Sequence, residues 1–87
     1  MPIINIAGKQ VHVEEGSESA EYAAKYLSKN PDNAKGIFAE AELNHEDHTS
    51  HYEVPNMHNS EDRSIAHHVT MIHNSDGTYT LQKRHGY

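Results

Sequence analysis

The chain has 87 residues, of which 34% are hydrophobic, and its 13 acidic and 7 basic residues give a formal net charge of −6. This length accommodates a single domain, and the absence of cysteine excludes a disulfide framework, a thiolate zinc site and a thiol nucleophile. No stretch approaches the ~20 apolar residues that cross a bilayer, no secretory signal pattern is visible, and the acidic balance argues against direct nucleic-acid binding. We expect a soluble, cytoplasmic domain of marginal stability, for which dimerisation would bury more surface.

Two β-rich runs flank Ala7 and Gly8 at the start of the chain. Residues 3–6 form the first run, and residues 9–14 form the second, in which valines alternate with polar residues. A tight hairpin at Ala7-Gly8 is one interpretation, although alanine is a poor first residue for a turn that needs positive φ. A single strand with a bulge at Gly8 is the alternative.

A helix is predicted over residues 17–30. Ser17 can accept hydrogen bonds from the free N–H groups of the first turn, and the residue before Pro31 is driven out of the helical region. The apolar positions recur at helical spacing and form one stripe: Ala20, Ala23, Ala24 and Leu27. Because this stripe is mostly alanine, we expect the helix to lie close to its packing partner.

A β-hairpin is predicted over residues 37–54. Residues 37–43 and 49–54 both alternate between apolar and polar side chains, and the polar segment 45–48 suits a four-residue loop. This pairing would place Glu42 opposite His51 and Glu40 opposite Glu53 on the outer face of the sheet. The side chain of Phe38 would also point outward, away from the core.

A second hairpin is predicted around Asn74-Ser75-Asp76-Gly77. This sequence is typical of a type I turn that ends with glycine in the left-handed conformation. The loop length predicts three cross-strand pairs, His73 with Tyr79, Met71 with Leu81, and Val69 with Lys83. The pairs gather apolar side chains on one face, as a core requires.

These elements predict an α+β fold made of one domain over residues 1–87. The order is strand, strand, helix and then four strands, which we interpret as a curved antiparallel sheet with the 17–30 helix on one face. We expect a mobile loop at about residues 55–63 and a flexible C-terminus at residues 85–87.

Histidine is unusually frequent, with nine residues. His45, His48 and His51 lie near Glu42 and Asp47, and imidazole with carboxylate is a natural ligand set for Zn, Ni or Cu. However, the spacing matches no fixed zinc motif, so a solvated loop is the favoured interpretation. Protonation of all nine histidines would change the net charge from −6 to +3.

The predicted outer face carries a second candidate site: Phe38, Glu40, Glu42, His51 and Glu53. Two carboxylates directly opposite each other are unfavourable in a sheet, unless both side chains extend into water, which is the simpler interpretation. The alternatives are a basic protein partner and then a metal ion between them. Phe38 would serve as an apolar anchor for the partner. A homodimer formed through the same face would also cover these residues.

Enzymatic motifs such as a nucleophile elbow or a phosphate-binding loop are missing. We therefore predict a small acidic binding or regulatory protein with no cofactor and no catalysis, which acts on a basic protein surface. An inhibitor that imitates nucleic acid is one form of this hypothesis. The alternatives are a transition-metal binder that uses Zn or Ni, and a small acid/base enzyme with a Glu42–His51 pair.

Overall fold

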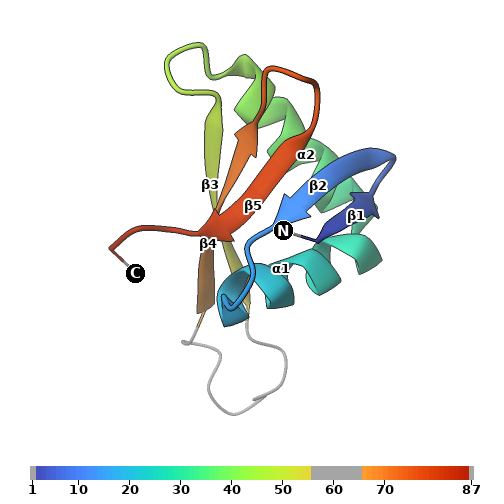
Figure 1. Ribbon diagram of the computed structural model, residues 1–87, viewed down its shortest axis with the longest axis vertical. Helices are drawn as coiled ribbons and strands as arrows, with labels where there is room; N and C mark the ends of the chain where they lie inside the picture. The colour runs from blue at the N-terminus through green and yellow to red at the C-terminus, as the bar shows by residue number, and fades with distance from the viewer. Residues whose placement is uncertain (1, 56–65, 87) are drawn as a thin grey trace.

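The computed structural model describes residues 2–55 and 66–86, and the described chain begins with a β-hairpin (Figure 1). Strand β1 (Ile3–Ile6) pairs antiparallel with β2 (Lys9–Val13), and Ile6 lies opposite Lys9 across a two-residue turn. Ala7 and Gly8 adopt φ angles of 49° and 85°, the left-handed values that this tight turn requires. The predicted hairpin is confirmed, and the single-strand alternative is wrong.

Helix α1 (Glu18–Lys29) confirms the prediction for residues 17–30. The N-cap residue Ser17 accepts a hydrogen bond at its Oγ from the Ala20 N–H at 3.2 Å, and Asn30 ends the helix. The predicted alanine and leucine stripe is the buried face of the helix. The helix therefore packs on the sheet through small side chains.

Helix α2 (Pro31–Leu43) replaces the strand that was predicted for residues 37–43. Pro31 ends α1 and also begins α2, since proline is favoured at the first helical position, where no N–H is needed. Four side chains at helical spacing form the buried face of α2: Ala34, Ile37, Phe38 and Ala41. Phe38 is only 3% exposed, so its predicted outward position is also wrong.

The error has a physical cause, because residues 37–43 fit both periodicities. Alternation places Ile37, Ala41 and Leu43 on one side of a strand, but it leaves Phe38 in water. Helical spacing buries Phe38 beside Ile37 and exposes Leu43 instead, and alanine, glutamate and leucine are strong helix formers. A helix buries the larger side chain, Phe38, and residues 37–43 are helical in the structure.

The remaining strands are β3 (Thr49–Pro55), β4 (Ala66–His73) and β5 (Tyr79–Lys83). Strand β4 pairs antiparallel with β5, and the three predicted pairs of this hairpin are all present in the register. Gly77 has the left-handed φ of 90° that the turn requires. Strand β3 pairs antiparallel with β4, with His51 opposite Thr70 and Glu53 opposite His68, in place of the predicted pairing with residues 37–43.

The sheet is mixed and has the order β1-β2-β5-β4-β3. Strands β2 and β5 are parallel, because the chain crosses from β2 through both helices to the far edge and then returns through β3 and β4. The α+β class is confirmed, whereas the wholly antiparallel sheet, its strand order and the single helix are wrong.

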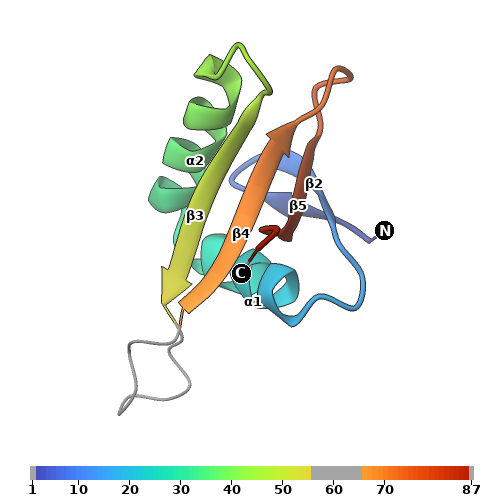
Figure 2. The same ribbon diagram turned by 90° about the vertical axis from the view of Figure 1, so that its left-hand side faces the viewer.

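Both helices lie on the same side of the sheet (Figure 2). Helix α2 covers β3 and β4, and α1 crosses β4, β5 and the β1–β2 hairpin. The core lies between this helical layer and the inner sheet face, which contributes Val11, Val69, Met71, Tyr79 and Leu81. The other face of the sheet carries no helix among the described residues.

Neither helix in residues 2–55 and 66–86 has the length and apolar character of a membrane-spanning segment. The loop predicted at about residues 55–63 lies outside the described residues, except for Pro55, which belongs to β3. Of the predicted flexible C-terminus, Tyr87 also lies outside the described residues.

Candidate functional site

An acidic surface occupies the C-terminal part of α2 and the connection to β3. We call it the acidic tip and define it by five exposed residues: Glu40, Glu42, Leu43, Glu46 and Asp47. It lies at the end of the molecule that also carries the β4–β5 turn (Figure 1). The partial negative charge of a helix C-terminus adds to these carboxylates, and the last turn of α2 contains no basic residue.

Leu43 makes this surface unusual. It is 72% exposed, and Ile3 is the other large hydrophobic side chain that is well exposed in the described chain. Single exposed apolar residues are common on proteins, so Leu43 alone indicates nothing. An exposed leucine that has exposed acidic residues on both sides of it in the sequence, however, combines an apolar side chain with a negative potential.

Two carboxylates of the acidic tip also hold α2 on the sheet. The Ser50 hydroxyl on β3 donates to Glu40 Oε2 at 2.8 Å, and the Tyr79 hydroxyl on β5 donates to Glu42 Oε1. The donors are buried, with Ser50 5% and Tyr79 1% exposed. Both carboxylates remain on the surface, so their charges face solvent while their hydrogen bonds fix the helix.

Tyr79 lies at the centre of the contacts beneath the acidic tip. Burial, followed by the hydrogen bond and the negative charge of Glu42, raises the pKa of the Tyr79 hydroxyl well above its ordinary value. The phenol therefore remains a hydrogen-bond donor at neutral pH. Its ring contacts Phe38, with ring centroids 4.4 Å apart, and stacks on His73 at 4.9 Å.

Short-range hydrogen bonds order the loop between α2 and β3. Asp47 Oδ1 accepts from the Thr49 hydroxyl at 2.9 Å and from the Thr49 N–H at 3.2 Å. These bonds lower the pKa of the Asp47 carboxyl, with the hydroxyl as the larger cause. The Asn44 side chain also joins the loop ends, since its Nδ2 donates to the Thr49 carbonyl at 3.1 Å.

His48 connects the same loop to the β4–β5 hairpin. Its carbonyl accepts from the His73 N–H at 2.8 Å, and the two imidazole rings meet edge to face with centroids 6.4 Å apart. His48 has a φ of 56°, which is uncommon for a residue other than glycine. The loop is therefore hydrogen-bonded at its ends and to the neighbouring hairpin.

The residues of the predicted binding surface do not share one face. Glu40 and Glu42 belong to the helical side, whereas Phe38 is in the core. Ser50 points toward α2, so the adjacent His51 points to the opposite side of the sheet, as does Glu53. The predicted contacts of Glu42 with His51 and of Glu40 with Glu53 are therefore wrong.

On that opposite face, each of the two residues has a neighbour on β4. His51 Nδ1 lies 2.9 Å from the Thr70 hydroxyl, and Glu53 Oε1 lies 3.5 Å from His68 Nδ1. These are cross-strand contacts of the kind that stabilise a sheet. They do not join the acidic tip.

The three histidines of the predicted metal site are also separated by the fold. His45 and His48 lie in the loop, and His51 lies on the helix-free face of β3. Residues 2–55 and 66–86 contain no group of three or more His, Asp or Glu side chains placed to hold a metal ion. A general acid/base pair of Glu42 and His51 is not formed, because Glu42 accepts from Tyr79 instead.

Leu43 was not predicted as a binding residue, because the predicted strand placed it on the buried face. Glu46, in the loop that follows, was not selected either. One sequence signal could have indicated the tip. No lysine or arginine occurs between Lys35 and Arg63, whereas residues 40–53 contain five acidic residues. An interval that contains carboxylates and no lysine or arginine gives a locally negative surface potential.

Comparison with known proteins finds no matching family, no similar curated protein and no similar solved structure.

Proposed function

We propose that this protein is a small noncatalytic binding protein whose acidic tip docks onto a basic surface of another protein. The observation that carries the proposal is the exposed Leu43 among four carboxylates in a segment without lysine or arginine. Complementary potentials steer association and select partners, and a central apolar contact contributes affinity once water is excluded. The partner would present lysine or arginine around an apolar recess.

The rigidity of the acidic tip supports this role. Glu40 and Glu42 are anchored by buried hydroxyl groups, and Asp47 is fixed by Thr49. A surface that is ordered before binding loses less conformational entropy when the partner arrives. The helix C-terminus and the loop would therefore present their charges in a fixed arrangement.

The test uses a fluorescein-labelled amphipathic peptide of lysine and leucine as the probe, with its glutamate counterpart as the control peptide. We expect the basic peptide alone to bind, and ¹⁵N chemical-shift changes to centre on residues 40–47. Changes centred on another surface, or equal binding of both peptides, would contradict the proposal. Binding should weaken with added salt, since exposed charges are screened.

Matched substitutions sharpen this test. Leu43→Ser and Glu46→Lys should each weaken peptide binding by roughly tenfold, an effect of one apolar or charged contact. Ile3→Ser and Glu18→Lys make the same chemical changes on other parts of the surface and should leave binding unchanged. Circular dichroism would verify that all four variants fold. Glu40 and Glu42 are avoided, because their loss would also loosen α2.

A further inference from the structure

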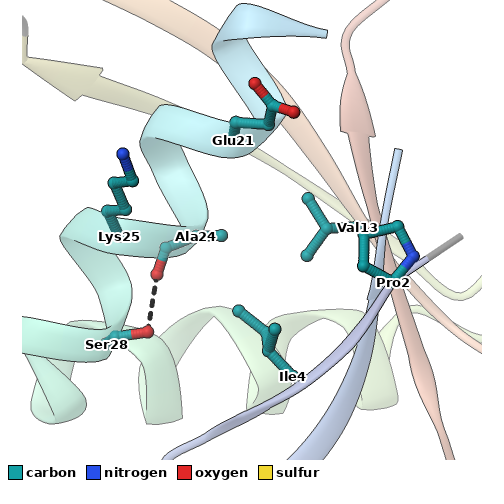
Figure 3. A pocket seen from close by; sticks show the side chains of 7 residues that line it. All are labelled: Pro2, Ile4, Val13, Glu21, Ala24, Lys25 and Ser28. Atoms are coloured by element: carbon teal, nitrogen blue, oxygen red, sulfur yellow. Dashed lines mark hydrogen bonds between the residues drawn. The ribbon is translucent and has the colours of Figure 1, made fainter. Parts of the chain in front are cut away.

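A groove lies between α1 and the β1–β2 hairpin (Figure 3), and no residue of the acidic tip lines it. Its volume is about 410 Å³. Pro2, Ile4 and Val13 form one side, and Ala24 of α1 lies across from them (Figure 3). The remaining lining includes Glu21 and Lys25, which are exposed and lie one turn apart on α1.

The groove adjoins the β1 edge of the sheet, where no further strand pairs with β1 among residues 2–55 and 66–86. Strand β1 is the terminal strand, and its sequence Ile-Ile-Asn-Ile contains no charged residue. Proteins commonly protect such edges with lysine, proline or a bulge, because an open edge can pair with another strand. The opposite edge strand β3 contains Glu53 and ends at Pro55, so β1 is the less protected of the two.

The hydrogen-bond register shows which backbone groups of β1 are available. The Val13 N–H donates to the Pro2 carbonyl at 2.9 Å, so the Pro2 carbonyl points toward β2. Because this direction alternates along a strand, the N–H and C=O groups of Ile4 and Ile6 also point toward β2. The intervening Ile3 and Asn5 therefore direct their N–H and C=O groups to the open edge. Ile3 also exposes 55% of its surface.

We propose that the β1 edge and its groove form a homodimer interface, in which β1 pairs antiparallel with β1 of a second copy and the two sheets become continuous. A two-fold axis at Ile4 would set Ile3 against Asn5 of the second copy and Asn5 against its Ile3. All the outward backbone groups of both residues would then be paired. The Ile4 side chains of the two copies would meet in the groove.

Charge complementarity identifies the second copy as the occupant. The groove carries one acidic and one basic residue on the same helix, and a two-fold axis repeats each contact in the reciprocal direction. In the proposed dimer, Glu21 of each copy would face Lys25 of the other. A chain with a net charge of −6 would otherwise repel its twin, and this contact would bring opposite charges together at the interface.

Sedimentation velocity over about a hundredfold range of concentration tests the interface. We expect a reversible monomer–dimer equilibrium. Ile3→Lys places a charge on the edge strand and should weaken the dimer by roughly tenfold or more. Leu43→Lys makes a comparable change at the other exposed hydrophobic residue and should leave the dimer intact. A monomer at all concentrations, or equal sensitivity to both substitutions, overturns the proposal.

A charge exchange tests the two-fold geometry. Glu21→Lys and Lys25→Glu should each weaken self-association, since each places like charges against each other twice. Mixing the two variants should restore association as a heterodimer, because both cross-contacts then join opposite charges. Failure of the mixture to associate more strongly than either variant alone overturns the pairing of Glu21 with Lys25. Circular dichroism of each variant would exclude unfolding as the cause.

Discussion

At the scale of single residues, one local arrangement occurs twice in the part of the chain that the structure describes. Asp47 and Asp76 each accept hydrogen bonds from the N–H and hydroxyl of the threonine two positions later. The intervening residue has positive φ in both cases, 56° at His48 and 90° at Gly77. Aspartate favours such turns because its short side chain reaches the backbone two residues ahead. The same chemistry therefore shapes the acidic tip and the β4–β5 turn.

The lowered pKa of Asp47 predicts an acid-dependent contribution to stability. A carboxyl group with a depressed pKa in the folded state stabilises the protein above its unfolded pKa of 3.8. This contribution is lost as the pH falls through the lower folded pKa. We therefore expect Asp47→Ala to destabilise the protein at pH 6 but to have a smaller effect at about pH 3. Urea unfolding at both pH values would measure the difference.

Asp76→Ala provides the comparison for this measurement. The pKa of the Asp76 carboxyl is also lowered, with the hydrogen bond from the Thr78 hydroxyl as the larger cause. The effect of Asp76→Ala on stability should therefore show the same pH dependence in the other turn. An Asp47→Ala effect of equal size at both pH values would show that its hydrogen bonds with Thr49 do not depend on the charge.

At the scale of elements, α2 is the segment that decides where the candidate site lies. Its buried stripe packs Phe38 against Tyr79, while the exposed side of its last turn carries Glu40, Glu42 and Leu43. A strand in the same place would expose Phe38 and bury Leu43. The position of the acidic tip is thus a consequence of helical periodicity.

This assignment predicts a large effect of Phe38→Ala. Removal of a buried phenylalanine side chain should cost about 3–5 kcal/mol in the free energy of unfolding. Ala39→Ser, at the exposed neighbouring position, should cost less than about 1 kcal/mol. Urea denaturation followed by circular dichroism would compare the two variants.

Phe38→Leu is the milder variant if Phe38→Ala fails to fold. It retains most of the apolar volume and should cost about 1–2 kcal/mol, with the midpoint of urea unfolding lowered accordingly. A negligible change for Phe38→Leu together with a stable Phe38→Ala would indicate that this side chain lies in solvent, as a strand would place it.

At the scale of the whole molecule, the two proposed surfaces differ in their physical character. Binding of a basic partner at the acidic tip would depend on charge, since residues 40–53 contain five acidic residues and three histidines. Pairing at the β1 edge would depend on backbone hydrogen bonds and apolar contacts, with Glu21 and Lys25 beside them. The two surfaces should therefore respond differently to pH.

Lowering the pH from 7.5 to 5.5 should weaken binding of the basic peptide while the dimer persists. Three of the nine histidines lie within residues 40–53, and protonation of all nine would change the net charge of the molecule from −6 to +3. Fluorescence anisotropy would follow the peptide, and sedimentation would follow the dimer in the same buffers. Peptide binding that is unchanged at pH 5.5 would contradict an electrostatic role for the acidic tip.

Short-range patterns in the sequence were sufficient for three parts of the fold. The turn at Ala7-Gly8, the cap at Ser17 and the turn at Gly77 each depend on residues within a few positions, so the β1–β2 hairpin, α1 and the β4–β5 hairpin were predictable. Their hydrogen-bond partners are local, and the conformational preferences of glycine, serine and proline act locally. Two carboxylates of the acidic tip, Glu40 and Glu42, were selected as binding residues, but from a strand pairing that the structure does not contain, and Glu46 was not selected.

Only the tertiary structure decided the state of residues 37–43 and the place of β2 beside β5. Alternation and helical spacing are both present in 37–43, and the choice depends on burying Phe38 against Tyr79, which lies far along the chain. The parallel pairing of β2 with β5 likewise joins strands from opposite ends of the sequence. Such contacts gain their free energy from packing between distant segments, and local sequence patterns contain no information about which distant surface will be available.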